Sequence, residues 1–336
     1  MERDEIIIRN GIVHILDSSV GLPALSDTVL ELGPDLNDFI RSLIYKIASG
    51  DEVKHCRFDE ETSQVYPLLK DFREDNLIEI SKELAKQLYT IMNQNIAIPA
   101  ADLLIATYQY QSEPYLAILK LNYKETFVHL TGETEGLSCN DIIKYKATLP
   151  AIGSRLTEAV LINLSSLETM LVEKKYEVNG VKTNYLSELF LGCKTRLSSK
   201  AKMAIVTKAV DQINKTYYED NFDKQMEAKS IIQNELAEEG HLDIPAITEK
   251  IYGEEPEIKE AFTEKLEKYH IEKERVKPQS QSTIKKLEKQ FLTTDSGIEI
   301  NIPMEQYNNP QNIEFITNDD GTLSVLIKNI NHLSAK

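Results

Sequence analysis

The sequence predicts an α+β fold with an antiparallel sheet, and three observations along the chain support that prediction. Short strand-like runs follow one another closely between residues 99 and 183, as in neighbouring antiparallel strands. From about residue 185 the apolar residues recur instead at three- and four-residue steps, the period of an amphipathic helix. After residue 297 apolar and polar residues alternate again. We therefore expect an N-terminal α+β domain over residues 1–182 with helices flanking its sheet, a helical module over 183–278, and a short basic helix with a small C-terminal β element over 279–336.

The N-terminal part begins with the β-rich runs Ile6–Ile8 and Ile12–Leu16 on either side of Asn10-Gly11, which indicates either a tight hairpin or one strand broken by a bulge. Helical spacing of apolar residues then predicts helices over residues 36–47 and 77–92. The strands of the sheet are expected at Leu103–Tyr110, Tyr115–Asn122, Phe127–Leu130, Ile142–Tyr145, Ala159–Asn163 and within Glu168–Tyr176.

In the second half, the same helical period predicts helices at Tyr185–Leu191, Ser198–Tyr218, Phe222–Glu239, Pro245–Tyr252 and Glu257–Tyr269. A polar linker over 277–283 leads to a short basic helix over 283–292 that contains Lys285, Lys286 and Lys289. Three alternating runs, Ile298–Ile302, Ile313–Thr317 and Thr322–Lys328, predict the C-terminal strands.

Composition narrows the class of protein. The 336 residues are 41% hydrophobic, which is ample for a packed core, and no apolar run approaches the ~18 residues of a membrane span. The start of the chain, Met1 to Glu5, lacks the basic and apolar regions of a signal peptide, so we expect a cytoplasmic protein with no membrane partner. The three cysteines are too few and too scattered for a disulfide framework or a CxxC metal site.

Charge indicates a partner. The chain has 38 Lys+Arg against 54 Asp+Glu, a net charge of -16, so only a concentrated basic patch would attract a polyanion. Such a patch lies between Gly192 and Tyr218, where one acid, Asp211, stands among six basic residues: Lys194, Arg196, Lys200, Lys202, Lys208 and Lys215.

The predicted helix over residues 198–218 separates its apolar and basic residues. At about 100° per residue, Lys200, Lys208 and Lys215 project from the side opposite the apolar stripe. Lysines along one helix face can bind phosphates of any base sequence, because they need no contact with base edges. The alternative interpretation is an ordinary amphipathic helix whose lysines only keep it solvated.

Catalytic motifs are weak in this sequence. The glycine spacings of GxGxxG, GxxxxGK[ST] and GxSxG are absent, and the six histidines never pair at metal-ligand spacing, so we expect no cofactor, no metal and no enzyme. One enzymatic hypothesis is a metal-dependent nuclease built on Glu173 and Lys175, which share a face at the end of a predicted strand. It needs a second carboxylate, for which Asp141 is a candidate.

Three segments resemble the NdpA-type family of bacterial nucleoid-associated proteins, a 37 kDa class. They are HILDSSVGLPALSD (residues 14–27), FLGCKTRLSSKAK (190–202), and GIEINI (297–302) with the run from Gly321 to Lys328. They occur in the family's order and span nearly the whole chain. The resemblance implies a cytoplasmic protein found with the chromosome that binds double-stranded DNA with little sequence preference and needs no known cofactor. It also supports Lys194, Arg196, Lys200 and Lys202 as DNA contacts.

The functional prediction is therefore nucleoid association through weak, sequence-tolerant contacts with DNA phosphates. One alternative is a scaffold that reaches the nucleoid by binding a DNA-processing protein, in keeping with the charge of -16; the other is the nuclease. A homodimer formed through the edges of the C-terminal strands would double the phosphate contacts.

Overall fold

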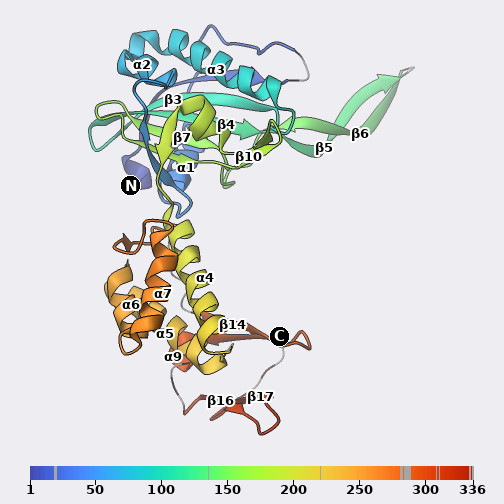
Figure 1. Ribbon diagram of the computed structural model, residues 1–336. Helices are drawn as coiled ribbons and strands as arrows, with labels where there is room; N and C mark the ends of the chain where they lie inside the picture. The colour runs from blue at the N-terminus through green and yellow to red at the C-terminus, as the bar shows by residue number, and fades with distance from the viewer. Residues whose placement is uncertain are drawn as a thin grey trace. The chain divides into compact units, whose positions relative to one another are not determined.

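The computed structural model describes residues 1–18, 21–134, 136–219, 221–280, 283, 289–307, 309, 311–332 and 334. The chain forms two compact units, Met1–Ser198 and Ser199–Lys336. The first contains a seven-stranded antiparallel sheet with helices, and the second contains helices with short hairpins (Figure 1). This mixture confirms the predicted α+β class.

The sheet of the first unit has the strand order β1-β3-β4-β7-β8-β2-β11, and every neighbouring pair is antiparallel. Its strands are β1 (Ile7–Leu16), β2 (Lys54–Phe58), β3 (Ala101–Tyr110), β4 (Glu113–Asn122), β7 (Ala159–Asn163), β8 (Thr169–Val172) and β11 (Cys193–Thr195). The first run of the chain is one strand whose register shifts between Ile8 and Asn10, so the structure selects the bulge over the hairpin. The expected strand within Glu168–Tyr176 is shorter, as β8.

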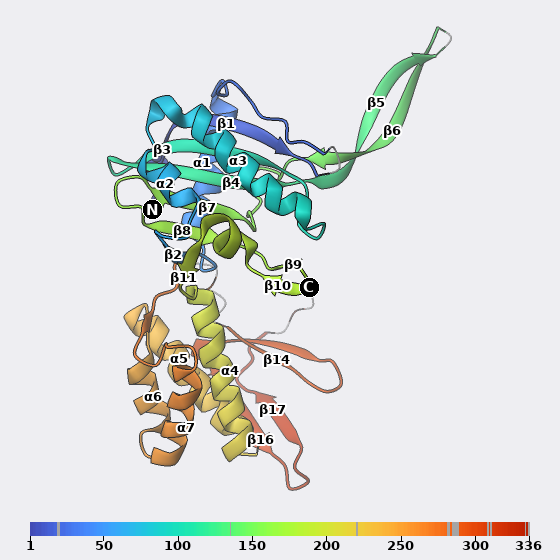
Figure 2. The ribbon, with the colours of Figure 1, turned by 45° about the horizontal axis from the view of Figure 1, so that its top comes forward.

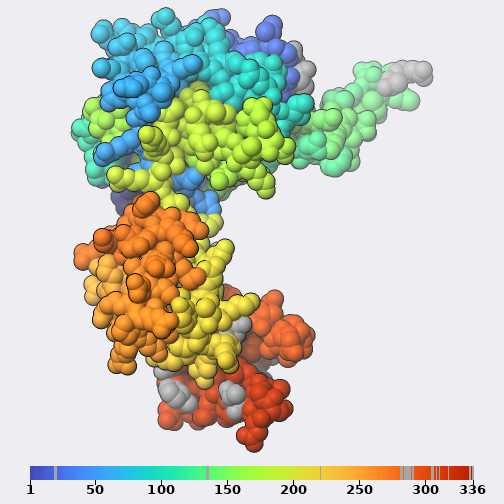
Figure 3. All heavy atoms as spheres, viewed as in Figure 1, coloured from blue at the N-terminus to red at the C-terminus, as the bar shows by residue number. Residues whose placement is uncertain are grey.

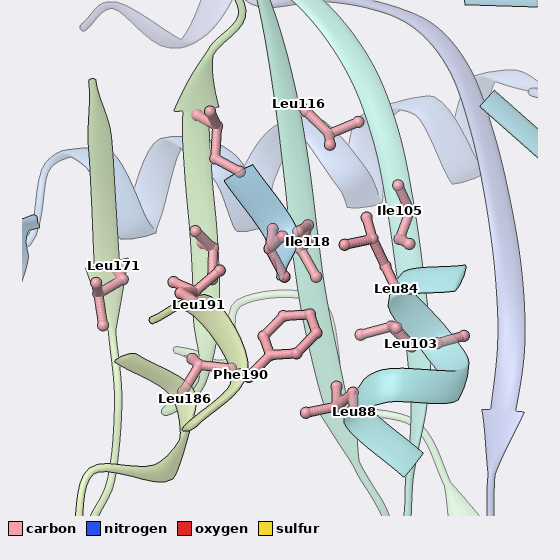
Figure 4. Packing of buried hydrophobic residues seen from close by; sticks show 14 of the residues in the cluster. Leu84, Leu88, Leu103, Ile105, Leu116, Ile118, Leu171, Leu186, Phe190 and Leu191 are labelled. Atoms are coloured by element: carbon pink, nitrogen blue, oxygen red, sulfur yellow. The ribbon is translucent and has the colours of Figure 1, made fainter. Parts of the chain in front are cut away.

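Helices cover both faces of this sheet (Figure 1). Helix α1 (Pro34–Ala48) packs on one face, and α2 (Val65–Lys70), α3 (Leu77–Gln94) and the one-turn π-helix η3 (Leu186–Leu191) pack on the other. Successive side chains of β4 point to opposite faces of the sheet and so join two separate hydrophobic cores. Ile118 belongs to the core that packs against α3, and Leu119 belongs to the core that packs against α1. Figure 4 shows Leu84 and Leu88 of α3 and Phe190 of η3 packed over the central strands.

A long hairpin extends beyond the sheet of the first unit (Figures 2 and 3). It consists of β5 (Lys124–Thr134) and β6 (Leu137–Thr148), which pair with each other. Apolar side chains on both of its faces are exposed, including Phe127 at 71% and Leu130 at 53%. Smaller elements of this unit are η1 (Arg3–Glu5), η2 (Glu74–Asn76) and the hairpin β9 (Tyr176–Val178) with β10 (Val181–Thr183).

The second unit is built around four helices: α4 (Ser199–Tyr217), α5 (Phe222–Glu239), α6 (Ile244–Tyr252) and α7 (Pro256–Glu267). Their buried residues include Val210 and Ile213 of α4 and Phe262 of α7. Side-chain caps begin two of the helices: Asn221 accepts from the backbone N–H of Lys224, and Asp243 accepts from that of Ala246. Strands β12 (Leu242–Asp243) and β13 (Arg275–Val276) pair beside them.

The C-terminal part of the second unit forms two separate hairpins, with the short helix α9 (Met304–Tyr307) between them in the chain. One pairs β14 (Lys289–Thr293) with β15 (Glu299–Pro303), and the other pairs β16 (Ile313–Thr317) with β17 (Leu323–Ile327). The expected basic helix over residues 283–292 is therefore wrong over residues 289–292, which belong to β14. A helix of about ten residues is marginal in water, and pairing with β15 satisfies the backbone of this segment instead. No helix among the described residues is long and apolar enough to cross a membrane.

His14 on β1 is fully buried, and its hydrogen bonds fix it as the neutral ring. Its Nδ1 accepts from the backbone N–H of Ser26 (3.1 Å), and its Nε2 lies 3.0 Å from Ser81 Oγ, whose own proton goes to the carbonyl of Ile78 (2.9 Å). Nε2 therefore donates to Ser81. Burial first, and then the charge of Lys82, lower the pKa of His14 from 6.5 to about 4.

This shift predicts a loss of stability in mild acid. The unfolded chain takes up a proton at His14 as the pH falls below 6.5, whereas the folded chain does so only near pH 4. Its contribution to the free energy of unfolding should fall by about 2 kcal/mol between pH 7.5 and 5. Urea unfolding of the parent and of His14→Gln at both pH values measures this difference. His129→Gln, on the exposed hairpin, is the control, and an equal pH dependence in parent and His14→Gln would contradict the assignment.

Candidate nucleic-acid interface

Helix α4 presents a basic face along most of its length. The buried side of the helix includes Val206, Ala209, Val210 and Ile213, and this apolar stripe places Lys200, Lys208 and Lys215 on the exposed side. The other exposed residues of this side are uncharged: Ala204, Thr207, Gln212 and Thr216. At 1.5 Å per residue the three lysines span about 22 Å. We call Lys200, Lys208 and Lys215 the α4 lysine face.

Side chains of α5 pair with Asp211, the one acid between Gly192 and Tyr218. Asp211 Oδ1 accepts from Gln225 Nε2 (2.8 Å) and lies 3.5 Å from the Lys229 ammonium, both on α5. On α7, Lys265 donates to Gln212 Oε1 (3.3 Å), which brings a further ammonium to the exposed side of α4. Within the described part of the chain, Lys208 and Lys215 form no ion pair. The α4 lysine face therefore concentrates positively charged side chains, although the chain as a whole is acidic.

Lys202 differs from the other lysines of α4. Its side chain is only 17% exposed, and its ammonium is paired with the carboxylate of Glu274. An ammonium already paired with a carboxylate releases few counterions when a phosphate approaches. The structure therefore separates Lys202 from the α4 lysine face.

In the first unit, Lys194 and Arg196 lie at one edge of the sheet. Lys194 is the middle residue of the edge strand β11, where its side chain is 90% exposed and its ammonium lies 4.0 Å from Asp59. Its cross-strand partner is Arg57 on β2. The backbone N–H of Arg196 donates to the carbonyl of His55 (2.8 Å), which continues the pairing. Arg57, His55 and Arg196 are all exposed.

Arg57 was not predicted from the sequence as part of this edge. The signal was present in β2, where buried Cys56 and half-buried Phe58 alternate with the exposed His55 and Arg57. A run of five residues is too short to distinguish a strand from a loop by alternation alone.

The position of β11 depends on Gly192. The π-helix η3 ends there with φ +59°, a left-handed conformation, and an added Cβ would lie 2.9 Å from the Cα of Ser63. The Gly192 carbonyl accepts from the backbone N–H of Asp59 (3.0 Å), and Ser63 Oγ donates to the carbonyl of Leu191 (2.5 Å). This close approach directs the chain into the strand that contains Lys194.

Gly192→Ala should consequently destabilise the first unit. The left-handed conformation alone costs about 1–2 kcal/mol for a residue with a Cβ, and overlap with the Ser63 backbone adds to that cost. Gly180→Ala is the matched control, because Gly180 has φ +82° but has open space around it. Urea unfolding should show a larger loss for Gly192→Ala. Equal losses would mean that the contact with Ser63 has no energetic effect.

The remaining basic candidates lie near the C-terminus. Lys289 is exposed on β14, in a strand and not in the expected helix, while Lys285 and Lys286 lie outside the described residues.

The residues of the nuclease hypothesis have other partners. The carboxylate of Glu173 is fully buried, where it accepts from Lys54 Nζ (2.9 Å), from the backbone N–H of Ser187 (3.0 Å) and from Ser187 Oγ (3.0 Å). It thereby joins β2 to η3. Asp141, the proposed second carboxylate, lies on the exposed hairpin strand β6. Among the described residues, His, Cys, Asp and Glu form no group of three that could hold a metal ion. The structure gives the nuclease hypothesis no support.

These features define an α+β protein with an exposed basic helix face and no assembled metal site among its described residues. A model of the family described as "Nucleoid-associated protein YejK" matches residues 12–333. The chain therefore belongs to this family of nucleoid-associated proteins, which confirms the resemblance seen in its sequence. A search of curated proteins finds no match.

Proposed function

We propose that this protein associates with the nucleoid by direct, weak and sequence-tolerant contact with DNA phosphates through the α4 lysine face. The observation that supports this most strongly is the exposure of Lys200, Lys208 and Lys215 on one side of α4, where Asp211 is held by α5. Ammonium groups on a convex helix attract phosphates of any sequence, whereas base reading needs bidentate side chains in a groove. Membership of a nucleoid-associated family agrees with this role and with a location in the nucleoid.

A second basic surface belongs to the proposal. Lys194, Arg57 and Arg196 add positive charge at the β11 edge of the first unit. Lys194 and Arg196 precede α4 in the chain by only a few residues. A homodimer would double the number of phosphate contacts and raise the avidity of individually weak contacts.

Direct binding is tested with the purified full-length chain and unrelated DNA duplexes of equal length. Fluorescence anisotropy at several salt concentrations should give similar affinities for all duplexes and a linear fall of log K with log salt. A protein that never contacts DNA would show no salt-dependent binding of naked duplex. That result would favour the scaffold alternative, in which a DNA-processing protein recruits this chain.

A further inference from the structure

The helical unit contains a pocket that is separate from the α4 lysine face. Its volume is about 470 Å³, and it lies between the last turns of α4, the first half of α5 and the end of α6 with the turn that follows it. Its lining includes Asn214, Tyr218, Lys224, Glu254 and Glu255.

One buried side chain in this pocket lacks a hydrogen-bond partner. Asn214 is 4% exposed, and its Oδ1 accepts no hydrogen bond in the part of the chain that the structure describes. Leaving a buried carbonyl oxygen unpaired is costly, because it has lost its water without gaining another donor. Since Oδ1 can only accept, the missing partner is a hydrogen-bond donor.

The charges around Asn214 favour a cation as that donor. Six charged residues line the pocket, four glutamates and two lysines. Both lysines already contact carboxylates: Lys224 lies 3.6 Å from Glu227, and Lys250 donates to Glu235 (2.5 Å). Glu249 is paired with Lys259. Among the described residues Glu254 and Glu255 form no ion pair, and Glu255 accepts from the hydroxyl of Tyr218.

The end of a helix and an aromatic ring also favour a cation in this pocket. The last turn of α6, Glu249 to Tyr252, lines the pocket. The C-terminal end of a helix carries a partial negative charge, which attracts a cation. The Lys224 ammonium lies over the ring of Tyr218, 5.6 Å from its centroid, so an amine already occupies one aromatic face here. Burial, and then the hydrogen bond to Glu255 and the charge of Glu255, raise the pKa of Tyr218.

We propose that this pocket binds a ligand with a primary ammonium or guanidinium group, whose N–H donates to Asn214 Oδ1 while its charge is balanced by Glu254 and Glu255. The group can come from a free polyamine or from a lysine or arginine side chain of a protein. A site for such a cation would add a second kind of partner to a nucleoid-associated protein, independently of whether its own lysines contact DNA.

Isothermal titration calorimetry on the full-length protein tests the proposal, with spermidine as the polyamine and N-acetyl-lysine methylamide and N-acetyl-arginine methylamide as the side-chain probes. At least one probe should bind with one-to-one stoichiometry. Asn214→Leu and Glu254→Gln should each weaken that binding by about tenfold or more, because each removes a hydrogen bond or charge contact with a cation. Binding of spermidine alone would identify a polyamine site, and binding of the amino-acid amides would identify a site for a protein side chain.

Two controls separate this site from general attraction and from misfolding. Glu260→Gln removes one exposed carboxylate on α7, outside the pocket, and should leave the affinity unchanged. Asn214→Leu replaces an unpaired polar group with an apolar one of similar size, so its melting temperature should stay the same or rise. The proposal is overturned if no probe binds, or if Asn214→Leu binds as tightly as the parent.

Discussion

Replacing Lys200, Lys208 and Lys215 together with glutamine should make the plot of log K against log salt shallower by up to about 2.7 for duplex DNA. The slope is about -0.9 for each phosphate that a protein cation neutralises, and these three ammonium groups lie exposed on one side of α4. At 0.1 M salt this corresponds to a loss of affinity of up to about 500-fold. The loss should be the same for unrelated duplexes. Because glutamine has a helix propensity close to that of lysine, the unfolding transition should not change.

The control for this variant removes the same charge elsewhere. Lys86, Lys144 and Lys259 each contact a carboxylate, of Glu83, Glu125 and Glu249 respectively. Their joint replacement by glutamine changes the net charge equally but should leave the salt slope near that of the parent. If both triple variants weaken binding alike, long-range charge and not the α4 lysine face governs the affinity.

The largest effect on stability is expected at the buried ion pair of Lys120 and Glu158. Both side chains are essentially inaccessible, and the Glu158 carboxylate accepts from Lys120 (3.3 Å), from Asn122 (2.7 Å) and from the hydroxyls of Tyr176 and Tyr185. Lys120→Met would leave a buried carboxylate without its cation. The free energy of unfolding should fall by about 3–5 kcal/mol. Tyr185 directly precedes η3, so this network also stabilises the segment that leads to Gly192 and β11.

Urea unfolding of two further variants tests the cause of that loss. Adding Glu158→Gln to Lys120→Met removes the unpaired charge but keeps an oxygen for Tyr185, and should restore part of the stability. Lys124→Met, at an exposed position of β5, should change stability by no more than about 0.5 kcal/mol. If the double variant is less stable than Lys120→Met, charge burial is not the cause of the destabilisation.

Periodicity alone predicted the helices of the second unit and most strands of the first. Apolar residues at three- and four-residue steps placed α4, α5 and α6 within a residue or two of their observed bounds, because each helix buries one continuous stripe. Strand β2 and helix α2 were missed, since elements of five or six residues offer too few periods to recognise. The segment over residues 289–292 was expected to be helical, but its pairing with β15 determines its structure.

The candidate site was predictable only where it depends on neighbours in sequence. That Lys208 and Lys215 lie on the exposed side of α4 follows directly from the spacing of residues along a helix. The pairing of Lys202 with Glu274 and of Asp211 with Lys229 does not, because it depends on how other helices pack against α4. The same applies to Asn214, whose spacing marks it as buried but whose unpaired oxygen depends on the ends of α5 and α6.

Site-directed cross-linking tests most directly whether the α4 lysine face contacts DNA. Cys56 and Cys193 are buried, so replacing the exposed Cys139 with serine leaves a background in which an added thiol is the accessible one among the described residues. In that background, Lys208→Cys should form a disulfide with duplexes that bear a thiol tether on a backbone phosphate, whatever their base sequence. Lys86→Cys on α3, also exposed, is the comparison. Efficient cross-linking at position 208 and little at position 86 is the predicted result; equal yields at the two positions, or none at 208 when the duplex is bound, would contradict it.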